Sequence, residues 1–436
     1  MTDRRSFLKT SALALPGLSA IGTFHSANGA PQPGGPWLSD LSRTLPDYVS
    51  VDEEDYWAAV QKLYALTDSR IYMNTGGLGP VSFPVLERFR ELTTDLQMQS
   101  ETGHRFIEEA RKPVATFLGA KPEEIAFIRN ATEGNATVAS GLDLKKGDEI
   151  IIDASAHPGG AIPWLNQLKI KGVRIRVFDP TGLDAQAILD RIESLVSERT
   201  RVVQVSHITA PTGILMPVDE IAILCKEKNI WFHIDGAQSM GMMPINLPEV
   251  GCDSFATSGH KWLGAMHGTG VLYIKKARLD EVRPSEVGAY SDAGYALPDT
   301  FNYVASARRH ESGTRNAPLV ESVRVACEFM AGIGLQRVRD RGLYLTNRLR
   351  TGLTNIDSIE ILTPSDDSIR ASMLTFKSSK MGFSDLNRSL SASHKLRLRI
   401  VTEQDFNAIR VSLHVFNSPS QVDHVIQSVG EVLSTI

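Results

Sequence analysis

An aspartate and a lysine lie in two segments whose residue types could work together in catalysis. Residues 232–238 end a predicted buried strand with the carboxylate of Asp235, and residues 258–262 supply the amine of Lys261 further along the chain. Chemistry on pyridoxal 5′-phosphate (PLP) needs both groups, because a carboxylate keeps the ring nitrogen protonated and a lysine holds the aldehyde. Either group alone is weak evidence, since an aspartate after a strand is more often a cap and a His-Lys pair usually has no chemical role.

Taken together, the two segments resemble the signature of the class V aminotransferase superfamily. This family of fold type I PLP enzymes includes cysteine desulfurases, phosphoserine and alanine-glyoxylate aminotransferases, and isopenicillin N epimerases. The resemblance extends over residues 70–320 and is looser beyond them. It implies an enzyme in which Asp235 lies beside the ring nitrogen and Lys261 binds PLP covalently. Once displaced by substrate, the lysine would move the α-proton as a general base.

The resemblance assigns further residues to the cofactor. Gln238 would donate a hydrogen bond to its phenolic oxygen. Ser258 and His260 would donate to its phosphate. Ala131 and Thr132 stand where a predicted strand passes into a helix, and the amides at such a helix start would bind the same phosphate. The alternative for Thr132 is that it only caps the helix.

A histidine follows another predicted strand, at residues 149–152. His157 matches the family position whose side chain stacks on the pyridine ring, and we count it among the catalytic residues. Stacking contributes ~0.5–1.5 kcal/mol beyond area burial, and an imidazole can also transfer a proton. A lone loop histidine is structural more often than not, but Pro163 and Trp164 also fit the family pattern.

Residues 311–316 resemble a family loop that crosses to the phosphate of a neighbouring subunit. Thr314 would then complete a site that belongs to another chain. The resemblance therefore implies a homodimer whose two-fold interface passes through the active sites.

The substrate side needs a group that binds a carboxylate, and a bidentate guanidinium does this best. Arg410 resembles the arginine that binds the substrate carboxylate in the desulfurases, although a surface arginine is the alternative. Asn74 and Gly76 lie in a loop of permissive backbone at residues 74–80, where we expect the substrate entrance. Arg315 is a second candidate for binding an anion.

Two departures from the desulfurases bear on the reaction. Those enzymes carry a nucleophilic cysteine shortly before the residue that matches Arg410, whereas residues 399–406 of this chain contain no thiol. Persulfide chemistry is therefore not expected. Ala210 stands where desulfurases place an asparagine, and residues 206–213 look more like the isopenicillin N epimerase branch.

The elements that must position these residues alternate between β-rich and helical patterns from about residue 70 to 280. This alternation predicts an α/β fold, with a mostly parallel sheet covered by helices on both faces. Ligands bind beyond the carboxyl ends of strands in such sheets. The predicted strands are residues 125–128, 149–152, 173–178, 201–207, 230–234 and 270–274, and two predicted helices are residues 184–197 and 217–228.

A change of pattern after residue 316 predicts a second, smaller domain, and 436 residues exceed the usual size of a single core. Helices are expected at residues 319–332 and from 335 to about 353, with a β segment at 408–415. We therefore predict a large PLP-binding domain at residues 70–320 and a small α+β domain at residues 321–436. Residues 31–69 form an N-terminal segment before the large domain.

The first thirty residues resemble a twin-arginine signal peptide. Arg4 and Arg5 precede a mildly apolar run that ends in small residues, although Asp3 stands where Ser or Thr is commoner. Such a signal implies a folded enzyme exported to the periplasm, and the run is too short to span a bilayer. A disordered basic N-terminus is the alternative.

The overall composition excludes several classes of partner. The formal net charge is −4, which argues against nucleic acid or an anionic membrane. Three widely spaced cysteines suggest neither disulfides nor a metal site.

The expected reaction takes place at the α-carbon and amino group of a small-molecule substrate, either an amino acid or a peptide-linked amino acid. An aminotransferase comes first, and among exported relatives those that modify the glutamyl group of the siderophore pyoverdine are one match. An epimerase or a PLP lyase is the alternative. A non-catalytic PLP-fold binding protein would lack Lys261 or its aspartate, and a metal-dependent hydrolase would need a compact ligand spacing that the chain's histidines lack. That last alternative rests on His157, His207, His233 and His260.

Overall fold

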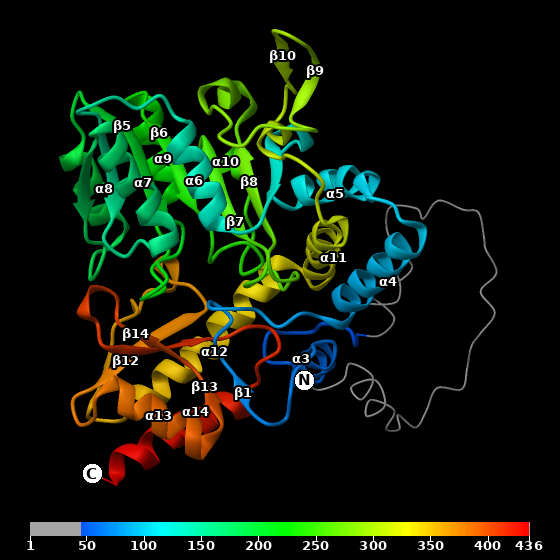
Figure 1. Cartoon of the computed structure of the whole chain (residues 1–436). Coiled ribbons are helices and arrows are strands. Elements are labelled where there is room, and N and C mark those ends of the chain that lie inside the picture. Colours follow the sequence, from blue (N-terminus) through cyan, green and yellow to red (C-terminus); the bar gives the residue numbers. More distant parts are fainter. Residues whose placement is uncertain (1–44, 436) are drawn as a thin grey trace, which may run out of the picture.

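A seven-stranded sheet forms the centre of the larger part of the molecule (Figure 1). The computed structural model describes residues 45–435. The strands lie in the order β2-β8-β7-β6-β5-β3-β4, parallel from β7 to β4, whereas β8 runs antiparallel to both of its neighbours. The strands are β2 (Ile125–Ile128), β3 (Glu149–Asp153), β4 (Arg174–Phe178), β5 (Thr200–Ser206), β6 (Trp231–Asp235), β7 (Ser254–Ser258) and β8 (Gly270–Ile274).

Helices cover both faces of this sheet, and its central strands are buried on both sides. On β3, Ile150 packs in one core with residues of α6 (Ala131–Gly141) and α7 (Pro158–Lys171). The next residue, Ile151, packs in another core with residues of α8 (Ala185–Leu195) and α9 (Val218–Glu227). The same core includes α3 (Glu54–Lys62), α4 (Phe83–Gln99), α5 (His104–Phe117), α10 (Leu247–Val250) and α11 (Ala317–Ile333).

The smaller part of the molecule contains a four-stranded antiparallel sheet in the order β11-β12-β15-β14. One face of this sheet packs on three helices around a second core, to which Leu374, Phe376, Ile409 and Val411 contribute. The alternate residues point the other way. The strands are β11 (Ile359–Ile361), β12 (Met373–Ser378), β14 (Arg399–Val401) and β15 (Ala408–Ser412), and the helices are α12 (Leu335–Thr354), α13 (Phe383–His394) and α14 (Pro419–Ser434).

The change from one core to the other falls within α12. Val338 near its start packs in the first core, whereas Leu345 and Leu349 pack in the second. The chain also returns to the second core through Met73, next to the short parallel pair of β1 (Ile71–Tyr72) and β13 (Leu396–Arg397). Short 3-10 segments lie at Pro122–Glu124, Lys276–Glu281, Ala307–His310, Asp367–Ile369 and Glu403–Asp405.

The structure confirms the predicted α/β fold with a mostly parallel sheet and helices. The prediction missed β7, whose sequence Ser-Phe-Ala-Thr-Ser carries polar residues although every position is buried. It also missed the hairpin of β9 (Asp292–Ala296) and β10 (Thr300–Tyr303), which projects from one end of the large sheet (Figure 1). None of the helices described is long and apolar enough to cross a membrane. The predicted signal at residues 1–30 lies outside the described residues.

Candidate active site

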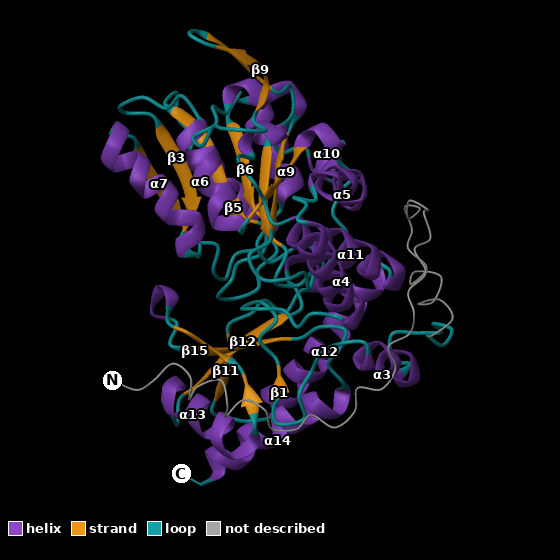
Figure 2. Ribbon diagram, turned by 45° about the vertical axis from the view of Figure 1, so that its right-hand side comes forward, coloured by secondary structure: helices purple, strands orange, loops and turns teal. Residues whose placement is uncertain are grey.

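Loops gather between the large sheet and the small sheet (Figure 2). Lys261 lies in this region, in the loop that follows β7. The pKa of its amine is lowered to about 8, chiefly by burial and also by the charges of Arg410 and Arg399, whereas the charge of Asp235 raises it. Within residues 45–435 the amine has no hydrogen-bond partner, so it is free to react. A Cβ on Gly79 would lie 1.8 Å from the backbone oxygen of Lys261, which shows how closely the 74–80 loop packs on it.

Asp235 is buried at the end of β6, and two donors hold its carboxylate. The side-chain amide of Asn135 donates to Oδ2 at 2.9 Å, and the backbone amide of Ala237 donates to Oδ1 at 3.0 Å. A Cβ on Gly160 would lie 2.6 Å from Oδ2, so the start of α7 also lies against this carboxylate. Donors of this kind stabilise the ionised form, which is the form that a protonated ring nitrogen requires.

A chain of buried hydrogen bonds continues from Asn135 into the sheet. Its Oδ1 lies 2.8 Å from His233 Nε2, and His233 Nδ1 lies 2.8 Å from the hydroxyl of Ser254. Burial lowers the pKa of His233 to about 3, so the ring is neutral and carries one proton. An amide oxygen only accepts, so that proton lies on Nε2 and Ser254 donates to Nδ1. Ser254 in turn accepts from the indole of Trp231 at 2.9 Å.

The start of α6 carries the predicted phosphate ligands Ala131 and Thr132, and Ser258 contacts it. The backbone amide of Ala131 donates to the hydroxyl of Ser258 at 3.0 Å, which leaves the hydroxyl proton of Ser258 available. A Cβ on Gly159 would lie 2.3 Å from Thr132 Oγ1, so the exposed threonine lies close to the start of α7. The Nδ1 atom of His260 is buried without a partner among the described residues. Donors of these types at a helix start fit a phosphate group.

His157 is the N-cap of α7, where its Nδ1 accepts from the amide of Gly159 at 3.1 Å. Burial lowers the pKa of this imidazole, the charge of Lys261 lowers it further, and Asp235 raises it. The capping bond fixes the orientation of the ring, and the residue keeps part of its surface exposed. Its position is compatible with stacking on a pyridine ring.

Gln238 is buried and both ends of its amide are engaged. Its Nε2 donates to the carbonyl of Gly76 at 2.9 Å, and its Oε1 accepts from the indole of Trp262 at 2.7 Å. The second proton on Nε2 remains available for a cofactor oxygen. The tryptophan is one residue after Lys261, so this bond also ties Gln238 to the lysine loop.

The structure brings Arg410, Asn74 and Gly76 together. Arg410 is buried, and its guanidinium donates to the carbonyl of Ala210 at 2.7 Å and to Asn74 Oδ1 at 3.1 Å. Burial lowers the pKa of Arg410 to about 9, which leaves it positive at neutral pH. Within residues 45–435 no carboxylate pairs with it. A buried cation of this kind is costly unless an anion binds it, which suits the carboxylate of a substrate.

The sequence reasoning missed Arg399 and Glu403, which border the same site. Arg399 lies directly opposite Arg410 in the register of β14 and β15 and forms an ion pair with Glu403. Both charges act on the pKa of His157. In the sequence, segment 399–406 stood out only for its missing thiol, because the register that places Arg399 opposite Arg410 depends on how β14 pairs with β15.

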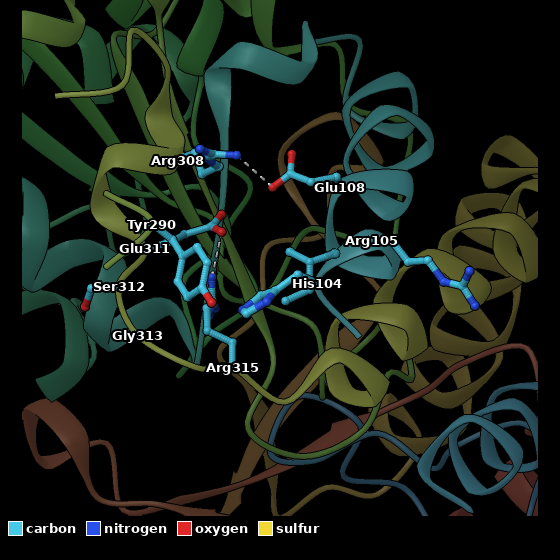
Figure 3. A pocket seen from close by; sticks show the side chains of 10 residues that line it. His104, Arg105, Glu108, Tyr290, Arg308, Glu311, Ser312, Gly313 and Arg315 are labelled. Carbon is cyan, nitrogen blue, oxygen red and sulfur yellow. Dashed lines mark hydrogen bonds and ion pairs between the residues drawn. The ribbon is translucent and has the colours of Figure 1, made fainter. Parts of the chain in front are cut away.

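Thr314 and Arg315 are not brought to Lys261 of the same chain. Arg315 donates to the carbonyl of Phe127 at 2.6 Å and pairs with Glu311 at 2.9 Å. It lies in the wall of a separate cavity of about 180 Å³, where Figure 3 shows it next to Glu311. The geometry of one chain therefore does not support Arg315 as a substrate ligand. Thr314 is exposed, and its role in a partner's site stays a prediction.

Within residues 45–435 no three histidine, cysteine or carboxylate side chains are placed to share a metal ion. His233 belongs to the hydrogen-bond chain behind Asp235, and His207 is buried with its ring edge toward Phe255.

Comparison with known proteins points to one family. The family model for "Aminotransferase class-V" matches residues 93–425. A probable cysteine desulfurase of Methanothermobacter thermautotrophicus is 28% identical over 86% of this chain and 97% of its own length. The isopenicillin N epimerase of Amycolatopsis lactamdurans is 26% identical over 86% of this chain and 98% of its own length. The apo structure of a cysteine desulfurase from Thermococcus onnurineus superposes with a TM-score of 0.80 at 26% identity, covering 90% of this chain and all of the other.

Proposed function

The chain belongs to the class V aminotransferase family. From this premise we propose that it is a PLP-dependent enzyme that acts at the α-carbon and amino group of an amino acid, as an aminotransferase. One observation carries the proposal. The amine of Lys261, with a pKa of about 8, shares its surroundings with the buried carboxylate of Asp235 and the buried guanidinium of Arg410. Lys261 would attach the cofactor, Asp235 would stabilise the positive charge on the cofactor's ring nitrogen, and Arg410 would bind the carboxylate of the substrate.

When bound, PLP supplies an electron sink for the charge left at the α-carbon. Asp235, oriented by Asn135, would hold the ring nitrogen of the cofactor through its carboxylate. Arg410 binds the α-carboxylate and so fixes which bond at the α-carbon faces the lysine. The amine of Lys261 takes a proton from the α-carbon and returns one, and a pKa of about 8 suits it to both tasks near neutral pH.

A persulfide route on an enzyme thiol has no support in this chain. The three cysteines Cys225, Cys252 and Cys327 are buried, and burial raises the pKa of each thiol. A thiolate is the reactive form, so these thiols are inert. This favours transamination over the desulfurase reaction named for several relatives. Epimerisation, as in the relative from Amycolatopsis, and elimination at the side chain are the alternatives.

The test uses the purified mature protein and its Lys261→Ala variant. The wild type should show the visible absorbance of lysine-bound PLP, and the variant should lack it. Amino acids and acidic peptides, including siderophore precursors with a glutamyl group, are then added singly with a keto-acid acceptor. Loss of the amine with formation of a keto acid means transamination, whereas unchanged mass with inverted chirality means epimerisation. A wild-type protein that takes up no PLP contradicts the proposal.

We further propose that residues 1–30 direct export to the periplasm and that the enzyme works as a homodimer. The paired Arg4 and Arg5 support the first proposal, and the loop that carries Thr314 supports the second. Replacing both arginines by lysine should keep the protein in the cytoplasm in a cell-fractionation assay. Light scattering of the mature protein should give twice the mass of one chain; a monomer with full activity would contradict the second proposal.

A further inference from the structure

Arg399 lies on the face of the small sheet that meets the active site. Its partner in the β14–β15 register is Arg410, whose own partner on β12 is Thr375. Thr375 donates to the carbonyl of Pro211 at 2.6 Å, and Arg410 donates to the carbonyl of Ala210. Both carbonyls belong to the loop after β5, at the carboxyl end of the large sheet. Residues that are paired in register share one face, so Arg399 points toward the same loops.

Two arginines directly opposite each other repel, and sheets usually avoid such pairs. Arg410 is fully buried and has no carboxylate partner within residues 45–435. Arg399 has one, Glu403, but its Nη1 atom is buried and makes no hydrogen bond in the described chain. The pair of guanidiniums therefore retains donors and positive charge that its protein surroundings do not satisfy.

The loop that carries Glu403 is held against the cofactor side of the site. Gln404, Asp405 and Asn407 all have positive φ angles, at 51°, 55° and 48°. Such backbone is strained for residues other than glycine. The hydroxyl of Ser155 donates to Gln404 Oε1 at 2.7 Å, which ties this loop to the connection between β3 and α7 that carries His157. The Arg399–Glu403 pair is thus fixed between His157 and Arg410.

We propose that Arg399 is a second anion-binding group of the site and that the substrate is an amino acid with a second carboxylate, of the glutamate or aspartate type. Arg410 binds the α-carboxylate, and Arg399 binds the distal carboxylate. Glu403 is the counter-ion that occupies Arg399 in the absence of substrate and gives way to it. This inference rests on the proposed function and adds the substrate class to it.

The test measures how tightly unreactive carboxylates bind to the PLP-loaded protein. Binding is monitored through the shift that each carboxylate causes in the visible absorbance of the protein. Glutarate and succinate carry two carboxylates, and butyrate carries one. The wild type should bind the better of the two dicarboxylates about 10- to 100-fold more tightly than butyrate, as expected for one additional charge-assisted contact. Arg399→Gln should remove this preference while leaving the dissociation constant of butyrate within about two-fold. Glu403→Gln should tighten dicarboxylate binding, since it removes the competing carboxylate.

Arg388 provides a matched control, because it is an exposed arginine of the small sheet's helix α13 that also pairs with a carboxylate on its own helix. Arg388→Gln should keep the wild-type preference, and the circular dichroism of each variant reports whether it has folded. A wild type that binds glutarate, succinate and butyrate equally, or an Arg399→Gln variant that keeps the preference, overturns the inference. In either case uptake of PLP and spectral changes with neutral amino acids leave the proposed function standing, whereas absence of PLP uptake overturns both.

Discussion

The side-chain amide of Asn135 donates to the carboxylate of Asp235 at 2.9 Å, across a gap of 100 residues in sequence. The same amide nitrogen also donates to the carbonyl of Gly159 at 3.1 Å, and both partners are acceptors. This arrangement fixes the orientation of the amide and directs its oxygen to His233. The asparagine therefore links the residue beside the cofactor to the interior of the sheet.

Asn135→Ala should lower the stability of the folded protein and weaken its binding of PLP. The variant leaves Asp235 Oδ2 without its side-chain donor and His233 Nε2 without its acceptor, and an unsatisfied buried polar group costs about 1–3 kcal/mol. We expect a loss of that size in the free energy of unfolding from urea titration, with about 10-fold weaker PLP retention in dialysis. Ser140→Ala, an exposed position on the same helix, is the control. If the two variants have the same free energy of unfolding and retain PLP equally well, the hydrogen bond from Asn135 to Asp235 does not contribute to PLP binding.

The rate of PLP uptake by the apoprotein should depend on pH through Lys261. Only the neutral amine attacks an aldehyde, and a pKa of about 8 makes half of it neutral at pH 8. An ordinary lysine at that pH is about 0.3% neutral. The rate, followed by stopped-flow absorbance, should therefore rise between pH 6.5 and 8.5 and level off above about pH 9. Nα-acetyl-lysine serves as the reference, and an uptake curve that follows this reference would contradict the lowered pKa.

Asp153 gives a second pH effect, this time on stability. It is buried at the end of β3, and burial raises its pKa to about 6, with the charge of Asp235 adding to the shift and bonds from Ser206 opposing it. Between pH 3.8 and 6 the folded protein binds more protons at this site than the unfolded chain, so stability falls as pH rises through this window. The full difference is about 3 kcal/mol.

Asp153→Asn should remove that dependence, because the amide does not ionise and its oxygen can still accept from the backbone amide of Ser206. We expect the variant to gain stability relative to the wild type from pH 4 to 6 and to keep that gain at higher pH. Urea titrations at several pH values measure it, with the exposed Asp143→Asn as control. A difference between variant and wild type that is the same at pH 4 and pH 7 would be incompatible with a raised pKa.

The parts of the site that could be predicted are those carried by short contiguous segments. Asp235 and Lys261 stand out because each lies in a motif of a few residues. Asn135 could not be recognised as a partner of Asp235, because their contact depends on how α6 packs against β6. His233 looked like one member of a scattered set of histidines, and its role follows from Asn135 and Ser254 on either side of its ring.

The same reasoning explains why the sequence did not reveal β7 or the surroundings of Arg315. Strand β7 was missed because its pattern is polar while its burial is set by β6 and β8 on either side. Arg315 looked available in sequence, but Glu311 is buried and attracts both Arg315 and Arg111. Which charged side chains pair with a buried carboxylate depends on the packed structure. Such a pairing cannot be recognised from the residues next to each other in the sequence.

Gly76 offers a test of how the substrate side is built. A Cβ at this position would lie 2.8 Å from Arg410 Nη2 and 2.9 Å from Gln238 Oε1. Real Cβ contacts of this kind are essentially never so short, so in Gly76→Ala either the guanidinium or the amide must move. Arg410 is enclosed by Asn74 and the carbonyl of Ala210 and has little room to do so. The variant should therefore disturb the carboxylate site directly.

We expect Gly76→Ala to raise the dissociation constant of amino acids about 10-fold or more in spectral titrations, because a charge-assisted bond to Arg410 is weakened. Uptake of PLP should change less, since Lys261 and Asp235 keep their surroundings. Gly382→Ala is the matched control, because a Cβ there meets no atom within 4 Å. If Gly76→Ala binds amino acids as the wild type does, Arg410 has moved at no cost, and its position against Gly76 does not define the carboxylate site.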